Sequence, residues 1–258
     1  IDKYQPKILY FDWWIHNHSF KPYLKKLAAY YYNRADEWGE EVTINYKHEA
    51  FPPTVATFDV ERGALTYISP IPWQTDTAIG KDSWGYRKDN TYKSTRQIIT
   101  DLIDIVSKNG MLLLNIGPKP DGTITNEETQ VLKELGEWMK LNGEGIYGTT
   151  FWKQFGEGDV NNEEGFFKDR EEKAFTEKDF RFTYKRGSIY AFQMRPNGEN
   201  AVIKALKKHN PHDFIIKRIT LLSTSETLKF ERNDNELIIK ANENFTNSSP
   251  ICFKIEID

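Results

Sequence analysis

The order of its expected elements constrains this chain most, because strand-like and helix-like segments alternate over residues 1–150 and then stop alternating. The apolar run from Ile8 to Trp14 is followed by helical periodicity from Pro22 to Trp38, which Gly39 ends. Repetition of this kind favours a parallel sheet covered by helices.

The rest of this first region keeps the same order. Ser94 and Gln97 have the spacing of a capping box, and so do Thr125 and Glu128, so each pair predicts the start of a helix. Short strands are predicted at Val42 to Tyr46, Thr57 to Val60 and Met111 to Ile116.

From Phe151 onward the pattern predicts antiparallel strands without helices between them. Hairpins are expected from Thr183 to Met194 and from Leu228 to Ala241, and Ile251 to Ile257 alternates like a further strand. The charged stretch from Gly156 to Lys178 is expected to be a loop or linker. We therefore predict two domains, a partial barrel at residues 1–150 and a small β-sandwich with an initial linker at residues 151–258.

The length of the first region limits the barrel. A closed (β/α)8 barrel takes about 250 residues, and only the first 150 precede the sandwich. Half a barrel leaves a sheet edge open, which folded proteins avoid. The predicted fold class is α/β, the C-terminal half of a (β/α)8-like barrel followed by a small antiparallel β-sandwich. We expect the missing N-terminal barrel half on the same or a separate chain.

Composition excludes several classes of partner. The net charge of −3 without a basic stripe argues against nucleic acid, and no apolar stretch reaches membrane-spanning length. The single cysteine, Cys252, allows no internal disulfide, and the five histidines lack zinc-site spacing, so no metal is expected. The compartment stays open between cytoplasmic and secreted, with a lean to a secreted or extracytoplasmic location.

One carboxylate closes the first apolar run. Asp12 stands among aromatic residues in the sequence Ile8-Leu-Tyr-Phe-Asp12-Trp-Trp, which fits a parallel strand buried on both faces. Catalytic groups of α/β barrels lie at the C-terminal ends of strands, and flat aromatic rings suit the C–H face of a sugar. The alternative is a buried aspartate satisfied by backbone donors or a neighbouring arginine.

Several motifs together resemble the family 29 α-L-fucosidases. The run ending at Asp12 resembles their nucleophile strand, and the segment Ser107-Lys-Asn-Gly110 with the following Leu112-Leu-Leu-Asn-Ile-Gly-Pro118 resembles their last-strand motif. The other matching stretches are Trp73-Gln-Thr-Asp-Thr, Ser83-Trp84-Gly85-Tyr86, Gly143-Glu-Gly-Ile-Tyr-Gly148 and Phe180-Arg-Phe-Thr183.

The resemblance implies release of terminal α-L-fucose from a fucosylated oligosaccharide or glycoprotein glycan, with retention of configuration and without a cofactor. By the same resemblance Asp12 is the nucleophile. Glu61 is the choice for the acid/base residue, with Glu49 as the fallback, because this part of the family varies in length. Retaining glycosidases use two carboxyl groups about 5–5.5 Å apart.

Six further residues are predicted to bind substrate, each beside a plainer structural reading. Arg62 could orient a carboxylate or a sugar hydroxyl, or it could be a plain surface charge, and Glu61 could instead be a surface glutamate paired with Arg62. Trp84 and Tyr86 could contact the fucose methyl group or pack within the barrel. The full predicted set is Tyr10, Trp14, His16, Arg62, Trp84 and Tyr86.

The chain departs from the family pattern at particular positions. Gln74 replaces the common glutamate, and Tyr10 stands where many relatives carry tryptophan. The family's histidines that grip fucose hydroxyls have no counterpart here. Two alternatives follow: a non-catalytic fragment acting as a glycan- or partner-binding module of a split enzyme, or a retaining glycosidase for a related deoxy or galacto-configured sugar.

Overall fold

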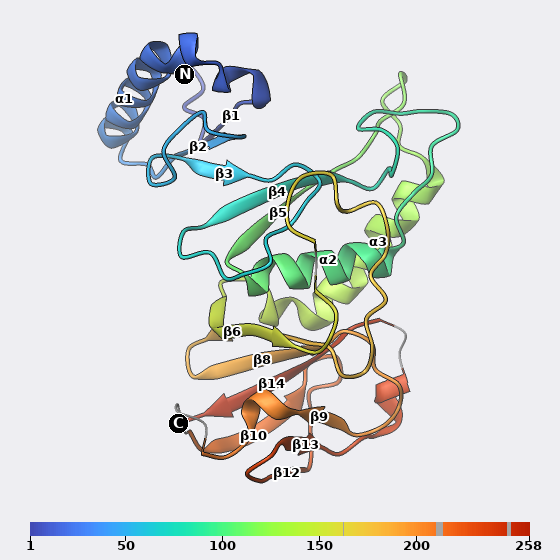
Figure 1. The fold of residues 1–258 in the computed structure, drawn as a ribbon. Coiled ribbons are helices and arrows are strands. Elements are labelled where there is room, and N and C mark those ends of the chain that lie inside the picture. The colour runs from blue at the N-terminus through green and yellow to red at the C-terminus, as the bar shows by residue number, and fades with distance from the viewer. Residues whose placement is uncertain (162, 210–213, 247–248) are drawn as a thin grey trace.

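Two stacked regions form the molecule, a parallel sheet with helices above an antiparallel region (Figure 1). The structure is a computed structural model, and it describes residues 1–161, 163–209, 214–246 and 249–258. The N-terminus lies in the upper region and the C-terminus in the lower one (Figure 1).

Five parallel strands form the upper sheet, in the order β1-β2-β3-β4-β5 that follows the chain. Each strand pairs in parallel register with the next, so all five C-terminal ends meet at one edge. Their bounds are β1 Ile8–Tyr10, β2 Thr43–Tyr46, β3 Thr57–Asp59, β4 Trp73–Ala78 and β5 Gly110–Asn115.

The predicted helices are confirmed with their caps. Ser94 accepts a hydrogen bond from the amide of Gln97, and Thr125 and Glu128 form a complete capping box. The α-helices are α1 Lys21–Trp38, α2 Thr95–Ser107 and α3 Asn126–Asn142; short 3₁₀ turns are η1 Trp13–His16, η2 His18–Phe20, η3 Gly143–Gly145, η4 Lys204–Leu206 and η5 Glu243–Thr246.

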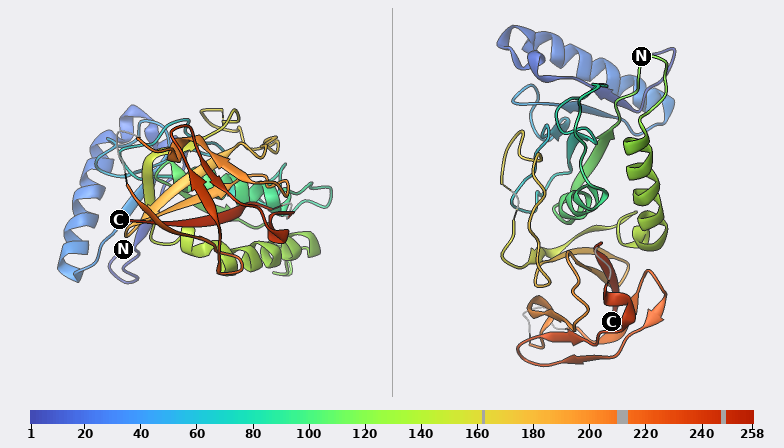
Figure 2. Two further views of the ribbon diagram at one scale, coloured as in Figure 1. Left: turned by 90° about the horizontal axis from the view of Figure 1, so that it is seen from below. Right: turned by 90° about the vertical axis from the view of Figure 1, so that its right-hand side faces the viewer.

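Helices cover one face of the curled sheet. Helix α1 packs Leu24, Ala28 and Tyr31 against Ile44 and its neighbours on β1 and β2. Helix α2 lies between β5 and the antiparallel strands β6 and β7, so it belongs to both regions (Figures 1 and 2).

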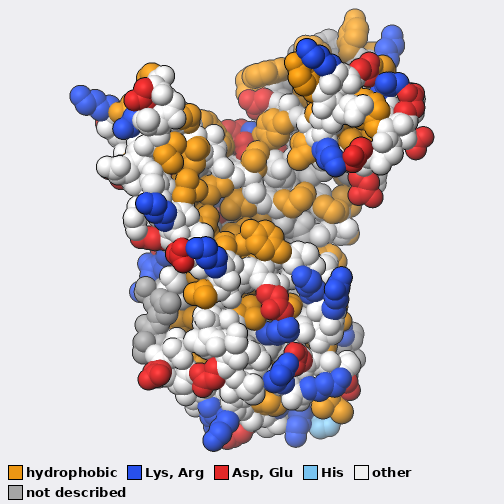
Figure 3. All heavy atoms as spheres, turned by 180° about the vertical axis from the view of Figure 1, so that it is seen from behind, with side chains coloured by type: hydrophobic (Ala, Val, Ile, Leu, Met, Phe, Trp, Pro, Cys, Tyr) orange, Lys and Arg blue, Asp and Glu red, His pale blue; other side chains and the backbone are white. Residues whose placement is uncertain are grey.

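The other face of the sheet is open at its two outer strands. Ile8 is 57% exposed on β1 and Leu113 is 47% exposed on β5. The prediction that the first strand is buried on both faces is therefore wrong, because no described element covers this face. Figure 3 shows hydrophobic side chains along the hollow between the two upper lobes. The strand also ends at Tyr10 rather than Trp14, because Asp12 starts the turn η1.

The lower region is built from two antiparallel sheets. The larger has the order β11-β10-β14-β8-β7-β6 and the smaller the order β12-β13-β9. Their strands are β6 Thr150–Glu157, β7 Phe180–Lys185, β8 Ser188–Gln193, β9 Ala201–Ile203, β10 Ile216–Leu221, β11 Glu226–Thr227, β12 Phe230–Arg232, β13 Leu237–Ile239 and β14 Ile251–Ile257.

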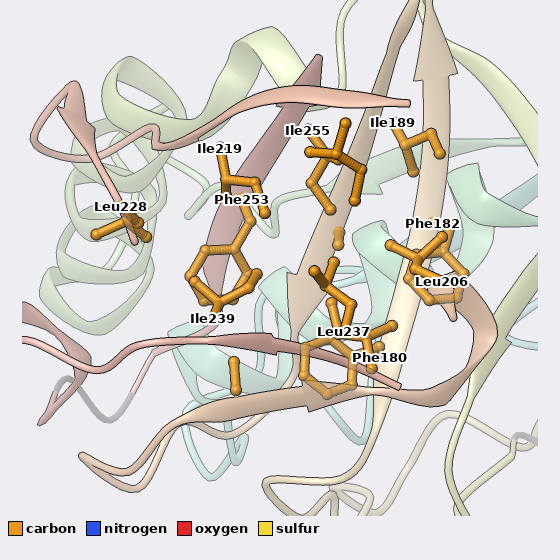
Figure 4. Packing of buried hydrophobic residues seen from close by; sticks show 14 of the residues in the cluster. Phe180, Phe182, Ile189, Leu206, Ile219, Leu228, Leu237, Ile239, Phe253 and Ile255 are labelled. Atoms are coloured by element: carbon orange, nitrogen blue, oxygen red, sulfur yellow. The ribbon is translucent and has the colours of Figure 1, made fainter. Parts of the chain in front are cut away.

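Alternate side chains of both sheets meet in one apolar core, as a β-sandwich requires. Phe180 and Phe182 on β7 face Leu237 and Ile239 on β13 (Figure 4). Both predicted hairpins are confirmed, with β7 and β8 joined at Arg186 and Gly187 and with β12 paired to β13.

The junction between the two regions has its own core and a buried charge network. Cys252 and Phe192 pack with Trp138 of α3, and the thiol is fully buried. Nearby, Arg181 of β7 contacts Asp104 of α2 at 2.5 Å, and Lys108 contacts the same carboxylate at 2.7 Å. Both cations hold the pKa of Asp104 below its usual value although burial alone would raise it.

The observed architecture is thus a mixed α/β fold, with a curled parallel half-barrel sheet beside antiparallel sheets. The assignment to the C-terminal half of a barrel and the division at residue 150 stay predictions. In the described part of the chain, no helix combines the length and the apolar character needed to cross a membrane.

Candidate active site

Ionisable side chains gather where neighbouring strands of the parallel sheet end. Asp12 follows β1, Lys47 directly follows β2, Glu61 follows β3 and Asp76 lies within β4. Because the strands are parallel, their exits meet at the edge of the sheet where α/β barrels place their catalytic groups.

Lys47 is the centre of this cluster. Its ammonium nitrogen lies 2.7 Å from Glu61 Oε2, 3.1 Å from Asp76 Oδ2 and 3.6 Å from Asp12 Oδ1. The side chain is buried, which alone would lower its pKa, but the hydrogen bond to Glu61 and the charge of Asp76 raise the pKa overall. The Lys47 ammonium therefore bridges the two carboxyl groups predicted to be catalytic.

A second layer of polar groups lies beneath Lys47. The Tyr10 hydroxyl donates to Asp76 Oδ2 at 2.9 Å, and burial with the nearby charges of Asp59 and Asp76 raises the pKa of Tyr10. Asp59 is fully buried near the Asp76 carboxylate, and Gln74 donates a hydrogen bond to its Oδ2. Burial and this neighbouring carboxylate raise the pKa of Asp59 to about 8.

Asp12 is the more accessible member of the predicted pair. Its side chain is 41% exposed, whereas that of Glu61 is 15% exposed. The amide of Trp13 donates to Asp12 Oδ1 at 2.7 Å, since Asp12 is the N-cap of η1. A carboxylate fixed in this way keeps one oxygen position constant while the group stays partly open to solvent.

Arg62 is buried beside the loop that carries Trp84, so it is not a plain surface charge. Its guanidinium donates to the carbonyl of Gly80 at 2.9 Å and lies 4.5 Å from the ring centre of Trp84. Arg62 therefore holds the loop that carries Trp84, and its guanidinium also lies 3.8 Å from the Asp169 carboxylate. Tyr86 on the same loop is partly exposed.

The aromatic residues after Asp12 form an exposed row. Trp14 packs edge-on against Trp13, and the ring of His16 lies 6.1 Å from Trp13 and 5.3 Å from His48. The row borders the carboxylate cluster, because Trp13 follows Asp12 and His48 follows Lys47. It offers flat apolar surface on the solvent side of the site.

Glu49, the fallback for the acid/base residue, is exposed, and in the described chain no hydrogen bond or ion pair links its carboxylate to Lys47. Glu61 is thus the glutamate that the fold brings beside Asp12.

Sequence reasoning missed three members of the cluster: Lys47, Asp59 and Asp76. Asp76 lies within the motif Trp73-Gln-Thr-Asp-Thr, yet its strand was not predicted because the four residues between Trp73 and Ala78 are all polar. The available signal for Lys47 was its position directly after the predicted strand that ends at Tyr46.

The described residues hold no group of three or more histidine, cysteine, aspartate or glutamate side chains arranged to bind a metal ion. Of the five histidines, His212 lies outside the described residues.

Comparison with known proteins gives a consistent family assignment. The family model described as alpha-L-fucosidase matches residues 1–144. The plasma alpha-L-fucosidase of Pongo abelii is 31% identical over 172 residues, which are 59% of this chain and 34% of that protein.

Solved structures extend the likeness to nearly the whole chain. A structure named alpha-L-fucosidase matches 99% of this chain with a TM-score of 0.77 and 28% identity. The Thermotoga maritima alpha-fucosidase, solved with a mechanism based inhibitor and with fucose, matches with TM-scores of 0.74 and 0.73 and 28% identity. In each case the chain spans about half of the relative, 53% of its length.

Proposed function

This chain belongs to the α-L-fucosidase family, and we propose that it carries the catalytic carboxylate pair of a retaining glycoside hydrolase that releases terminal α-L-fucose from glycans. The observation that carries this proposal is the bridge that Lys47 makes between Asp12 and Glu61. An ammonium in contact with both groups is compatible with the separation of about 5–5.5 Å that retaining glycosidases use.

In the first step of the proposed mechanism, Asp12 Oδ attacks the anomeric carbon of fucose. The bond between that carbon and the glycosidic oxygen breaks, and Glu61 gives its proton to the departing oxygen. The product of this step is a glycosyl ester on Asp12. Asp12 suits this role because its carboxylate is held by the Trp13 amide and is partly open to solvent.

In the second step, Glu61 takes a proton from water, whose oxygen attacks the same carbon and displaces Asp12. Two inversions give net retention. Asp76 and Tyr10 contribute by fixing Lys47 from below, since the lysine and the tyrosine hydroxyl both donate to Asp76. The cluster is thereby organised before substrate arrives, which lowers the cost of reorganisation.

The proposed ligand is a fucosylated glycan, supported by the fucose complex of the Thermotoga maritima relative. The aromatic row from Trp14 to His48 is the surface proposed to meet the sugar beyond fucose. A non-catalytic binding module is not favoured, because its site would need no bridged pair of carboxylates, and the matching relatives bear the name of an enzyme.

Hydrolysis of an aryl α-L-fucoside tests the proposal. We expect Asp12→Gly to lose activity and azide to restore turnover as an inverted fucosyl azide, because azide replaces the missing nucleophile. Asp89→Gly, which removes an exposed loop carboxylate paired with Arg87, is the matched control and should keep its rate. A silent wild type, or full activity in Asp12→Gly, would refute the proposed role of Asp12.

A further inference from the structure

A segment of the loop between β6 and β7 leaves the antiparallel region and returns to the parallel sheet. This segment, residues 163–170, is called the strap here. In Figure 1 the loop rises past α2 to the level of β4, and the second view in Figure 2 shows the same ascent. The strap ends beside the turn that follows β3, which carries Glu61.

Backbone hydrogen bonds join the strap to that turn. The amide of Phe167 donates to the Glu61 carbonyl at 3.0 Å, and the amide of Lys168 donates to the Arg62 carbonyl at 2.7 Å. Further along, Gly165 pairs with Ala64 as an isolated antiparallel bridge. The turn therefore receives its backbone partners from the strap on one side and from β4 on the other, where the Asp76 carbonyl accepts from the Arg62 amide.

The backbone conformation of the turn after β3 is suited to the close approach of the strap. Arg62 has a φ of 47°, in the left-handed region that costs a residue with a side chain about 1–3 kcal/mol, so its surroundings must hold it there. A Cβ on Gly63 would lie 1.9 Å from the carbonyl oxygen of Gly165. Glycine is needed at position 63 because the strap approaches the turn so closely.

Side chains anchor the strap to the sheet at two points. Asp169 contacts Lys93 Nζ at 2.5 Å, accepts a hydrogen bond from Thr77 and lies 3.8 Å from Arg62 NH1. Phe166 stacks on His48 with ring centres 5.0 Å apart. Lys93 is fully buried, so its pairing with Asp169 is shielded from solvent.

We propose that the strap positions Glu61 for proton transfer, so that the antiparallel region is part of the catalytic apparatus. This inference rests on the proposed function. Asp169 acts as a positioning residue: it touches neither Glu61 nor Asp12, and it fixes the strap whose amides hold the Glu61 turn. The position of the acid/base group then depends on a segment about 100 residues further along the chain.

Leaving-group dependence distinguishes this role from general support of the fold. A strongly activated aryl leaving group departs from fucose without receiving a proton, whereas an alkyl leaving group needs one. For Asp169→Asn we expect kcat/KM to fall at least about 10-fold more on the alkyl fucoside than on the activated one. Glu171→Gln, an exposed neighbour outside the strap, is the control and should change both rates equally or not at all.

Amide hydrogen exchange provides a second, activity-independent measurement. In wild type the amides of Phe167, Lys168 and Asp169 should be protected, and Asp169→Asn should lose that protection while the sandwich strands keep theirs. Equal losses on both substrates, or unchanged exchange in the variant, would overturn the inference. If wild type hydrolysed neither fucoside, the proposed function would fail, and exchange would still decide whether the strap holds the turn.

Discussion

Lys47 is the residue that joins the two candidate catalytic groups. It is buried, and its ammonium lies at contact distance from the carboxyl groups of Asp12, Glu61 and Asp76. Without it, these carboxyl groups would lose the cation that they share, and like charges at such distances repel strongly. Its contribution is therefore both to the fold of the site and to the separation of the pair.

Replacing Lys47 by methionine should lower the free energy of unfolding by about 3–5 kcal/mol, because removing one partner leaves buried charge uncompensated. The same variant should lose fucosidase activity, while Lys47→Arg should recover part of both. Urea denaturation and kcat/KM measure the two effects. Wild-type stability in Lys47→Met would mean that the ammonium is not the counter-ion of the cluster.

Asp59 gives the site a pH-dependent stability. Its pKa is raised to about 8 in the folded protein, against 3.8 for an ordinary aspartate. Between these two pH values the folded state keeps a proton that the unfolded state releases. The contribution of Asp59 to the free energy of unfolding is therefore fully present below pH 3.8 and is lost as the pH rises to about 8. The slope for one such proton is at most about 1.4 kcal/mol per pH unit.

Asp59→Asn should remove this fall, since asparagine is neutral at every pH. Urea denaturation at several values between pH 4 and 8 should show the variant gaining stability relative to wild type as the pH rises. Asp121→Asn is a control of opposite sign, because Thr123 hydrogen bonds lower the pKa of that exposed carboxyl. Parallel profiles for Asp59→Asn and wild type would contradict the raised pKa.

At the scale of elements, the joint between α2 and β7 depends on a buried ion network. Arg181 contacts Asp104 across the two elements, and both side chains are 1% exposed. Arg181→Met should lower the free energy of unfolding by about 3–5 kcal/mol, because the buried carboxylate of Asp104 then loses one of its cationic partners. Thermal or urea unfolding measures the loss.

Arg218→Met is the matched control on the same sheet. Arg218 pairs with Glu256 at the surface, where ion pairs contribute about 0–1 kcal/mol. Similar losses in the two variants would show that burial of the Asp104 pair does not matter.

The elements that the sequence predicts well are those whose signals are local. The helices at Thr95–Ser107 and Asn126–Asn142 carry their own caps, and the hairpin of β7 and β8 carries its own turn. Strand β4 is different, because its polar side chains are stabilised by partners such as Asp59 and Lys47 from other strands. The spacing of apolar and polar residues within this strand cannot indicate partners that lie on other strands.

The same distinction holds for the site. Asp12 is a candidate because it closes an apolar run and matches the family's nucleophile strand, and the choice of Glu61 rests on family resemblance. Lys47 was missed because a lysine after a strand is ordinarily solvated, and only the meeting of four strand ends buries it. The strap was expected only as a loop or linker, since its pairing with Glu61 and Arg62 depends on the tertiary fold.

At the scale of the whole molecule, the two regions differ in how fully their hydrophobic residues are buried. The sandwich core is closed, with Phe180 and Phe253 fully buried. The parallel sheet leaves Ile8 and Leu113 partly exposed on its open face. The strap and helix α2 connect the two, so damage to the sandwich is expected to reach the candidate site.

One cysteine can report when the parallel and antiparallel regions separate. Cys252 is the sole thiol of the chain; it is fully buried at the junction, and burial raises its pKa well above the ordinary value. A thiol reagent can modify it only after the junction opens, because the thiolate is the reactive form. The rate at which Cys252 is labelled in increasing urea should therefore measure how readily the junction opens. Comparison with the loss of tryptophan fluorescence should show whether the two regions separate before the molecule unfolds.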